Sequence, residues 1–404
     1  MRRCDPAYMC TWSTIPNTSV GADALVHWTE GGEARSARWL SESAAPPAKR
    51  IVIADDYITA DDAYGLACQG TALLWRGDFQ NARQMLYALA ARADRPQRRP
   101  KKPAVSPMPT SPAEVFHLHR QVRSQRARTL GALLVPLDED YGVPLRRAPD
   151  IRQACAEAYG PGEGPSVASL RALLGVIGAH EWRVKGIEIA AIGGRIHPHY
   201  GVFAPIRAEY VDLIALAPLP VLRSSSSSAF DIGTGTGVLA AVLARRGIER
   251  VIATDCDPRA LACAKENLER LGLVQQVQVV QADLFPAGRA AVVVCNPPWI
   301  PARPSSPIER GIYDPESRML RRFMGALPEH LEPGGEGWLI LSDLAEHLGL
   351  RTRSELLGAF HAAGLQVVDR SDVRPKHPRV FDETDPLHAA RAAEVTSLWR
   401  LAVR

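Results

Sequence analysis

The sequence predicts an α/β protein in which a mostly helical α+β domain precedes a parallel sheet with helices on both faces. From Phe230 onward, short apolar runs alternate with helical segments, which is the pattern of a doubly wound sheet. The chain has 404 residues, of which 46% are hydrophobic and 23% are charged. This length corresponds to about two or three domains, and a chain of this kind buries a large core without disulfides or metals.

Charge and cysteine usage narrow the classes of function. The net charge of +4 is only mildly positive and gives weak support for a nucleic-acid-binding face. The seven cysteines form no CxxC pair, so we expect neither a disulfide framework nor a metal site. No window approaches the ~20 consecutive apolar residues of a membrane-spanning helix, and no apolar segment follows the first arginines. We therefore expect a cytoplasmic protein with no membrane partner.

The first half of the chain has two predicted parts, the second of which contains a linker. Residues 1–45 show no clear periodicity, and we expect them to be disordered or loosely attached. Residues 46–190 form the predicted N-terminal domain, which contains a Pro/Arg-rich linker near 95–112. Proline lacks the N–H that a helix or a central strand needs, so this linker is interpreted as a solvated tether. The alternative interpretation is a clamp for RNA phosphate.

The elements of the N-terminal domain follow from local signals. The apolar run 51–54 predicts a strand. A capped helix is expected to begin at Thr59 and to continue to Trp75, with a second helix packed antiparallel to it after Gly77. A further helix is predicted over 113–131.

Residues 191–404 form the predicted second domain. A strand signal at 187–192 and a helix at 209–217 precede its sheet. The strands are predicted near 229–232, 250–254, 277–281, 291–295 and 337–342. The helices are predicted near 236–246, 257–271, 315–331 and 350–363.

A glycine-rich turn follows the first of these strands. The segment from Asp231 to Gly237 reads DIGTGTG, and a helix is predicted directly after it. Glycines let a backbone approach a ligand closely, and the helix N-terminus supplies free N–H groups. Val238 stands where a nicotinamide-binding GxGxxG pattern has its third glycine, so the spacing fits that class poorly.

Carboxylates follow the next two strands. Asp255 ends the second strand at a distance suited to a ribose diol, where a charged hydrogen bond contributes about 1.5–3 kcal/mol. Asp257 precedes Pro258 and is interpreted as a helix cap. Asp283 ends the third strand, and its carboxylate is suited to accept from an adenine amino group.

The segment Asn296-Pro297-Pro298-Trp299 follows the fourth strand. Its two prolines remove two backbone donors, so the Asn296 side-chain oxygen and nearby carbonyls remain as acceptors. Trp299 adds a flat aromatic face. This environment suits a planar group that carries an NH2, such as a carboxamide or an exocyclic base amine.

These residues together resemble the class I S-adenosylmethionine-dependent methyltransferases. More narrowly, they resemble the branch that methylates planar amino groups through an (N/D)PP(Y/F/W) motif, above all the protein-glutamine N5-methyltransferases of release factors. The resemblance covers about residues 195–370, including a pre-sheet segment at 201–209. Two departures stand out: Trp299 replaces the usual Tyr, and residues 1–190 do not resemble the short helical recognition domain of that group.

The resemblance implies a Rossmann-like methyltransferase sheet, with S-adenosyl-L-methionine as cofactor and target choice in the N-terminal domain. It implies that the cofactor is bound by Asp231, Gly233, Thr234, Gly235, Gly237, Asp255, Asp283, Leu284 and Asn296. It implies a catalytic site formed by Asn296, Pro297, Pro298 and Trp299.

The expected reaction is methyl transfer to the nitrogen of a protein glutamine or asparagine carboxamide. An alternative is an exocyclic amine of RNA or DNA, which the basic run 95–102 favours. A small-molecule amine is a third target. The fourth alternative is a non-catalytic protein that only binds the cofactor. The intact motif from Asn296 to Trp299 argues against this alternative, because cofactor binding alone does not need the motif.

Overall fold

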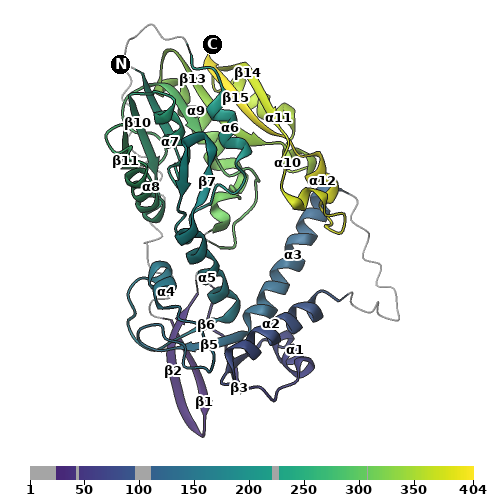
Figure 1. Cartoon of the computed structure of the whole chain (residues 1–404). Helices are drawn as coiled ribbons and strands as arrows, with labels where there is room; N and C mark the ends of the chain where they lie inside the picture. The colour runs from purple at the N-terminus through teal and green to yellow at the C-terminus, as the bar shows by residue number, and fades with distance from the viewer. Residues whose placement is uncertain (1–23, 42–44, 96–110, 221–226, 307) are drawn as a thin grey trace, which may run out of the picture. The chain divides into compact units, whose positions relative to one another are not determined.

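The computed structural model describes residues 24–41, 45–95, 111–220, 227–306 and 308–404. The chain divides into two compact units, one drawn from residues 1–96 and 126–175 and the other from 97–125 and 176–404 (Figure 1). This division differs from the boundary expected near residue 190. The division falls inside helix α5 (Leu170–Lys185), and the continuous pattern of a helix carries no sign of a boundary within it.

The first unit is built on a six-stranded sheet with the order β1-β2-β6-β5-β4-β3. The strands are β1 (Leu25–Glu30), β2 (Glu33–Leu40), β3 (Arg50–Ala54), β4 (Thr71–Trp75), β5 (Leu133–Leu137) and β6 (Ser166–Ser169). Strands β3, β4 and β5 are parallel, whereas β1 pairs with β2 and β5 pairs with β6 in antiparallel fashion. The helices of this unit are α1 (Ala60–Cys68), α2 (Phe79–Ala93) and α4 (Arg152–Tyr159), with parts of α3 (Pro112–Gly131) and α5.

The N-terminal region is more ordered than its composition suggests. Residues 25–40 pair as β1 and β2, so the expectation of disorder is wrong for this part of 1–45. Val26 and Trp39 explain the pairing, because both are buried against Leu74 and Leu134 in the core of the first unit. Residues 1–23 and the linker residues 96–110 lie outside the described residues.

The predicted helical pair of the first unit is interrupted by a strand. Helix α1 begins after Thr59, as predicted, with the hydroxyl of Thr59 accepting from the backbone N–H of Asp62 at 3.1 Å. The helix ends at Cys68, however, and β4 follows with all five residues buried. A fully buried strand is a short apolar run, which periodicity cannot distinguish from a buried helix.

The second unit contains a seven-stranded sheet with the order β11-β10-β9-β12-β13-β15-β14. The strands are β9 (Ser228–Ile232), β10 (Arg250–Asp255), β11 (Val277–Gln281), β12 (Ala290–Cys295), β13 (Leu331–Ser342), β14 (Leu365–Val373) and β15 (Thr396–Val403). The first five of these confirm the predicted parallel sheet. Strand β15 runs antiparallel to both of its neighbours, and β14 and β15 were not predicted.

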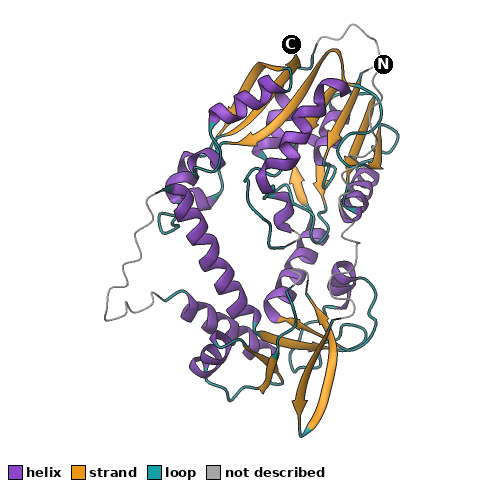
Figure 2. Cartoon of the chain, turned by 180° about the vertical axis from the view of Figure 1, so that it is seen from behind, coloured by secondary structure: helices purple, strands orange, loops and turns teal. Residues whose placement is uncertain are grey.

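Helices cover both faces of this sheet, which makes it doubly wound (Figure 2). The helices are α6 (Glu209–Leu216), α7 (Val238–Arg245), α8 (Pro258–Arg270), α9 (Arg318–His330), α10 (Leu344–His347), α11 (Arg353–Ala362) and α12 (His388–Ala393). A small antiparallel pair, β7 (Ile187–Ile189) and β8 (Gly194–Ile196), precedes α6. No helix among the described residues is long and apolar enough to cross a membrane.

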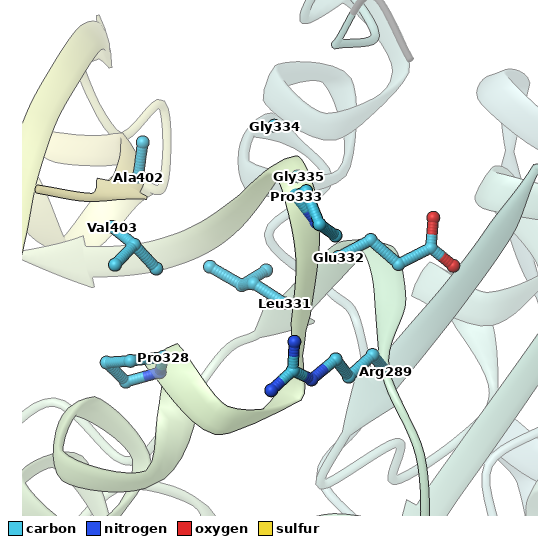
Figure 3. A pocket seen from close by; sticks show the side chains of 9 residues that line it. All are labelled: Arg289, Pro328, Leu331, Glu332, Pro333, Gly334, Gly335, Ala402 and Val403. Carbon is cyan, nitrogen blue, oxygen red and sulfur yellow. The ribbon is translucent and has the colours of Figure 1, made fainter. Parts of the chain in front are cut away.

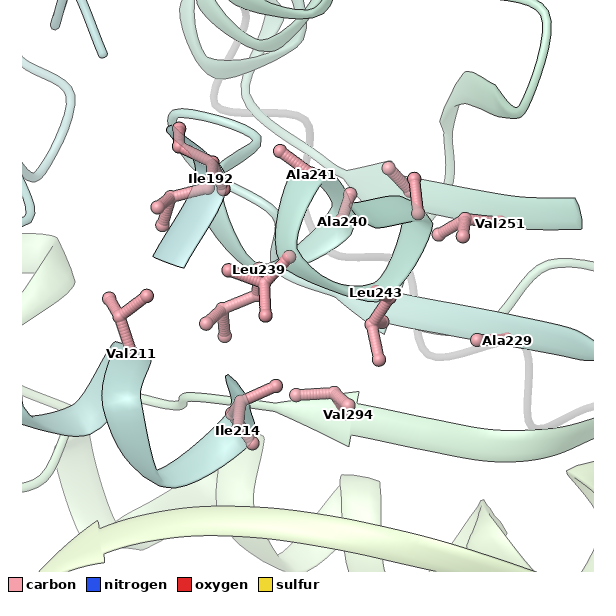
Figure 4. Packing of buried hydrophobic residues seen from close by; sticks show 14 of the residues in the cluster. Ile192, Val211, Ile214, Ala229, Leu239, Ala240, Ala241, Leu243, Val251 and Val294 are labelled. Carbon is pink, nitrogen blue, oxygen red and sulfur yellow. The ribbon is translucent and has the colours of Figure 1, made fainter. Parts of the chain in front are cut away.

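Alternation along the central strands builds two cores. Ala229 and Val294 face one core, in which they pack with α6 and α7 (Figure 4). Their neighbours Phe230 and Val293 face the other core, which α9 and α11 complete. Side chains of successive strand residues point to opposite faces of a sheet, so strands covered on both sides read as continuous apolar runs. Apolar cores therefore pack on both faces of the sheet. This packing fixes the positions of the strand ends, from which the loops of the candidate site begin.

Candidate active site

The predicted site residues meet where the order of the sheet reverses. Strand β9 lies between β10 and β12, and Ile232 pairs with Thr254 on one side and with Cys295 on the other. The segments that follow these three strands therefore leave the sheet at one edge. In open α/β sheets, ligands bind at such a point, outside the carboxyl ends of the strands.

The glycine-rich turn between β9 and α7 depends on left-handed backbone conformations. Gly233, Gly235 and Gly237 have φ values of 72°, 54° and 81°. A Cβ on Gly237 would lie 3.2 Å from the Cα of Ala264, so this glycine lets α7 and α8 approach closely. A Cβ on Gly235 would meet no atom within 4 Å. The backbone of the turn therefore borders open space at this residue.

Asp231 supports this turn from within. Its carboxylate is buried, and its Oδ2 accepts from the hydroxyl of Thr234 at 2.6 Å and from the backbone N–H of Ala240 at 3.0 Å. Burial raises the pKa of Asp231 to about 6. These hydrogen bonds tie the end of β9 to the first turn of α7. Asp231 and Thr234 thus form the base of the predicted cofactor loop.

Asp255 faces the same turn from the end of β10. Its Oδ2 accepts from the N–H of Gly235 at 3.0 Å, and its Oδ1 accepts from the N–H of Asp257 at 2.9 Å. A carboxylate has about four lone-pair sites, so each oxygen retains capacity for a further donor. Burial raises the pKa of the Asp255 carboxyl. Asp257 caps α8 as predicted, with its side chain accepting from Arg259 N–H at 2.9 Å.

Asp283 and Leu284 follow β11. Leu284 has a φ of 80°, unusual for a residue with a branched side chain, and its carbonyl accepts from the hydroxyl of Thr254 at 2.6 Å. The two carboxylate oxygens of Asp283 accept from Arg322 of α9, at 3.1 and 2.9 Å. Arg322 was missed by sequence reasoning, because it lies 39 residues away on another element. Both oxygens of Asp283 therefore already accept from a cation, and the adenine role of this carboxylate stays a prediction.

The Asn-Pro-Pro-Trp segment leaves β12 beside the glycine turn. The indole N–H of Trp299 donates to Oδ1 of Asn296 at 2.8 Å. Pro297 is buried and Pro298 half-buried, and neither has an N–H to donate. Trp299 is half-buried and packs against both cores of the sheet and against a third apolar cluster. The structure thus places the four predicted catalytic residues next to the predicted cofactor loop.

The chain after Trp299 folds back on itself. The N–H of Ile300 donates to the carbonyl of Ile312 at 3.1 Å, and the N–H of Asp314 donates to the carbonyl of Ile300 at 2.9 Å. The buried carboxylate of Asp314 then accepts from the N–H groups of Met319 and Leu320 at the start of α9, both at 3.1 Å. These bonds fix the backbone on the far side of Trp299.

A residue of α3 holds the same loop. The guanidinium of Arg120 donates to the carbonyl of Arg303 at 2.7 Å and lies 4.1 Å from the centre of the Tyr313 ring. Sequence reasoning assigned this helix to the N-terminal domain and missed the contact. An arginine on a helix gives no sign in the sequence of which distant loop it contacts.

The pre-sheet segment is anchored to α8. His197 donates from its backbone N–H to Oδ1 of Asn267 at 2.8 Å, and the ring of His199 lies 2.5 Å from a carboxylate oxygen of Glu266. Glu266 also pairs with Arg183 and Arg270, and the pKa of this carboxyl is lowered to about 2. Asn267 and Glu266 were not predicted, and the only signal for Asn267 was its place on the buried face of α8.

A hollow on the opposite edge of the sheet does not belong to this site (Figure 3). Arg289, Leu331 and Gly335 line it, next to the starts of β12 and β13. It lies at the amino ends of these strands, whereas the residues described above lie at the carboxyl ends. It holds none of the predicted site residues.

Comparisons with known proteins find similarity to methyltransferases. Residues 193–363 match the methyltransferase small domain family. A ribosomal protein L11 methyltransferase of Pelotomaculum thermopropionicum is 49% identical over 146 residues, which are 35% of this chain and 39% of that protein. A release factor glutamine methyltransferase of Cereibacter sphaeroides is 31% identical over 158 residues, 36% of this chain and 54% of that protein.

The chain therefore spans well under two thirds of the length of these two relatives. Among solved structures, a ribosomal protein L11 methylase from Lactobacillus delbrueckii subsp. bulgaricus is 17% identical and has a TM-score of 0.35. That comparison covers 52% of this chain and 86% of the other.

Proposed function

We propose that the chain methylates the nitrogen of a protein glutamine or asparagine carboxamide, with S-adenosylmethionine as cofactor, through residues 193–363, which match the methyltransferase small domain family. The observation that carries the proposal is the Asn296 to Trp299 segment, which lies beside the glycine turn and presents acceptors without backbone donors. The activity of the whole chain and its target both belong to this proposal.

The residues present fit the cofactor. The backbone of Gly235 borders open space, and Asp255 has lone pairs left for two hydroxyl donors, which suits a ribose. Leu284, in its left-handed conformation, and Asp283 would border the adenine. When bound, S-adenosylmethionine supplies an electrophilic methyl group on a sulfonium.

The chain's own residues would hold the acceptor nitrogen. An amide nitrogen is a poor nucleophile because its lone pair is delocalised into the carbonyl. Hydrogen bonds from its two N–H groups to Asn296 Oδ1 and to the Pro297 carbonyl would orient that lone pair toward the methyl group. Such positioning contributes up to ~7–11 kcal/mol in favourable cases. The proton can leave after transfer, so no strong base is needed beside Asn296.

The names of the relatives favour a protein target over a nucleic acid. Both relatives have protein targets in their names, a ribosomal protein in one and a release factor in the other. The basic run at 95–102, which favoured RNA, lies outside the described residues except for Arg95. We therefore place a protein carboxamide first, and an RNA amine is the outcome that would replace it.

The test uses the purified chain, methyl-labelled S-adenosylmethionine and an extract from cells that lack the enzyme. The labelled product is divided and treated with protease or with RNase. Label released only by protease, and found as methylglutamine or methylasparagine after hydrolysis, supports the proposal. Label released only by RNase contradicts it and moves the target to a base amine. The absence of macromolecular label points to a small molecule.

Two variants separate the roles of the residues. Asn296→Ala should lower the transfer rate by at least about a hundredfold while leaving cofactor affinity within a few fold, because it removes an acceptor for the substrate. Asp255→Asn should instead weaken calorimetric cofactor binding by roughly tenfold, since a charged hydrogen bond contributes about 1.5–3 kcal/mol. Normal transfer by the first variant, or unchanged affinity in the second, would show that the assigned role is wrong.

A further inference from the structure

We infer that Trp299 is a positioning residue, whose indole N–H fixes the orientation of the Asn296 carboxamide for methyl transfer. This inference rests on the proposed function and deepens it. The finding behind it is the hydrogen bond from Trp299 Nε1 to Asn296 Oδ1, with a length of 2.8 Å. Aromatic stacking, the role that sequence reasoning gave to this ring, does not require that bond.

An asparagine carboxamide can turn over by half a rotation and exchange its oxygen and nitrogen. In one orientation it offers an acceptor to the substrate, and in the other it offers two donors, which would repel a substrate N–H. The indole N–H is a donor only, so it can face only the oxygen of Asn296. The bond from Trp299 therefore selects the orientation in which Oδ1 accepts, and one lone pair of that oxygen remains for the substrate.

The donor is itself held rigidly. Trp299 packs against a third apolar cluster, which includes Ile300 and Leu344, in addition to the two cores of the sheet. Its backbone is limited on one side by two prolines and on the other by the bond from Ile300 N–H to the Ile312 carbonyl. A side chain locked by packing on several sides can hold a partner in the productive geometry.

Tyrosine or phenylalanine at this position would lack the same donor. Phenylalanine has no N–H, and the hydroxyl of tyrosine lies at the far end of its ring, away from where the indole nitrogen sits. The departure of this chain from the usual Tyr therefore changes what holds Asn296. The Trp299 ring provides a flat face, as a tyrosine ring would, and its indole N–H also donates to Asn296.

The first experiment detects the bond without measuring activity. With 15N-labelled tryptophan, the Trp299 indole resonance is assigned by its loss in Trp299→Phe. In the full-length protein, Asn296→Ala should then speed solvent exchange of the Trp299 indole N–H by at least about tenfold, as expected when a hydrogen bond is lost. Unchanged exchange in Asn296→Ala would overturn the inference.

The second experiment measures transfer from methyl-labelled S-adenosylmethionine to the extract. Trp299→Phe should lower the maximal rate by roughly ten- to hundredfold, with an unchanged KM for the cofactor, because the acceptor is no longer aligned. Replacement of Trp299 by benzothienylalanine, which keeps the bicyclic shape and substitutes sulfur for the N–H, should cause a comparable loss. A benzothienylalanine variant with the wild-type rate would overturn the inference even if Trp299→Phe were impaired or misfolded.

Trp28→Phe is the matched control. Trp28 also donates from its indole, to Glu30 at 2.9 Å, but it lies in the first unit. This variant should keep both the transfer rate and the Trp299 exchange rate of the wild type. If the wild-type protein transfers no label to the extract, the proposed function fails on its own, and the exchange experiment still decides whether Trp299 holds Asn296.

Discussion

The side-chain amide of Asn267 donates to the carbonyl oxygen of Thr236 at a distance of 3.1 Å. Through its Oδ1, the same side chain accepts from the backbone N–H of His197 at 2.8 Å. Asn267 is 1% exposed, so its amide is shielded from bulk water. One buried amide thus ties the glycine turn of the candidate site to the segment that precedes the sheet.

Asn267→Ala should destabilise the protein by about 1–3 kcal/mol, because it removes a buried amide that bonds to the His197 N–H and to the Thr236 carbonyl. It should also weaken cofactor binding, since the turn loses a support. Guanidinium denaturation and calorimetry measure the two effects. The exposed Gln278→Ala serves as the control and should change neither quantity. Wild-type stability of Asn267→Ala would mean that the turn does not depend on this amide.

The residues of the candidate site could be predicted from the sequence, whereas the residues that hold them in place could not. Strands β9 to β13 and the turns after them were predicted, because apolar runs and the glycines or prolines that end them are local signals. Asn267, Glu266 and Arg322 carry no such signal. Each acts through a residue on another element, and a single sequence does not show which helix faces which turn.

The first unit shows the other limit of local reasoning. Its β4 is a five-residue buried run, and the sequence analysis absorbed that run into a helix that in fact ends at Cys68. Strands β1 and β2 were missed because their alternation is weak, with burial concentrated at Val26 and at the end of β2. Long-range pairing with β6 stabilises β2, and such pairing is not visible in the local pattern.

The buried Asp231 should make stability depend on pH. Its folded pKa, about 6, lies above the ordinary value of 3.8, so the folded state binds more protons than the unfolded state between these values. The contribution of Asp231 to the free energy of unfolding should therefore fall as pH rises from about 4 to about 6, by up to about 3 kcal/mol. Above that range, this contribution should be constant.

Asp231→Asn isolates this effect. The bonds from the Thr234 hydroxyl and the Ala240 N–H both end on Oδ2, and an asparagine oxygen at that position would keep them. The difference in unfolding free energy between the wild type and the variant should therefore change across pH 4 to 6 and level off above it, as measured by denaturation at closely spaced pH values. A difference that stays constant across this window would show that the Asp231 carboxyl titrates normally.

Glu266 should produce the opposite sign. Its folded pKa, about 2, lies below the ordinary 4.5, and Arg270, His199 and Arg183 surround its carboxylate. Its contribution to stability should be present above about pH 4.5 and should be lost as pH falls toward 2. Glu266→Gln should cost about 1–2 kcal/mol at pH 7, after allowance for solvent screening, and progressively less below pH 4.5.

The neighbouring Glu269→Gln provides the comparison for Glu266. Glu269 lies on the same helix and is exposed, so its loss should change stability by no more than about 0.5 kcal/mol at any pH. Denaturation of both variants from pH 7 to pH 3 tests the pair. Equal effects of the two substitutions would mean that the ion pairs of Glu266 do not contribute to the free energy of unfolding.

Arg120 should control the loop that follows Trp299. Its guanidinium holds the carbonyl of Arg303 and stacks on Tyr313, so Arg120→Ala removes both supports at once. We expect faster hydrogen–deuterium exchange in peptides that contain Ile300 to Arg303, and a transfer rate lowered by roughly three- to tenfold at unchanged cofactor affinity. Arg123→Ala, an exposed change on the same helix, should leave both readouts at wild-type values. If Arg120→Ala slows transfer without faster exchange in this loop, Arg120 acts on the substrate and not on the loop.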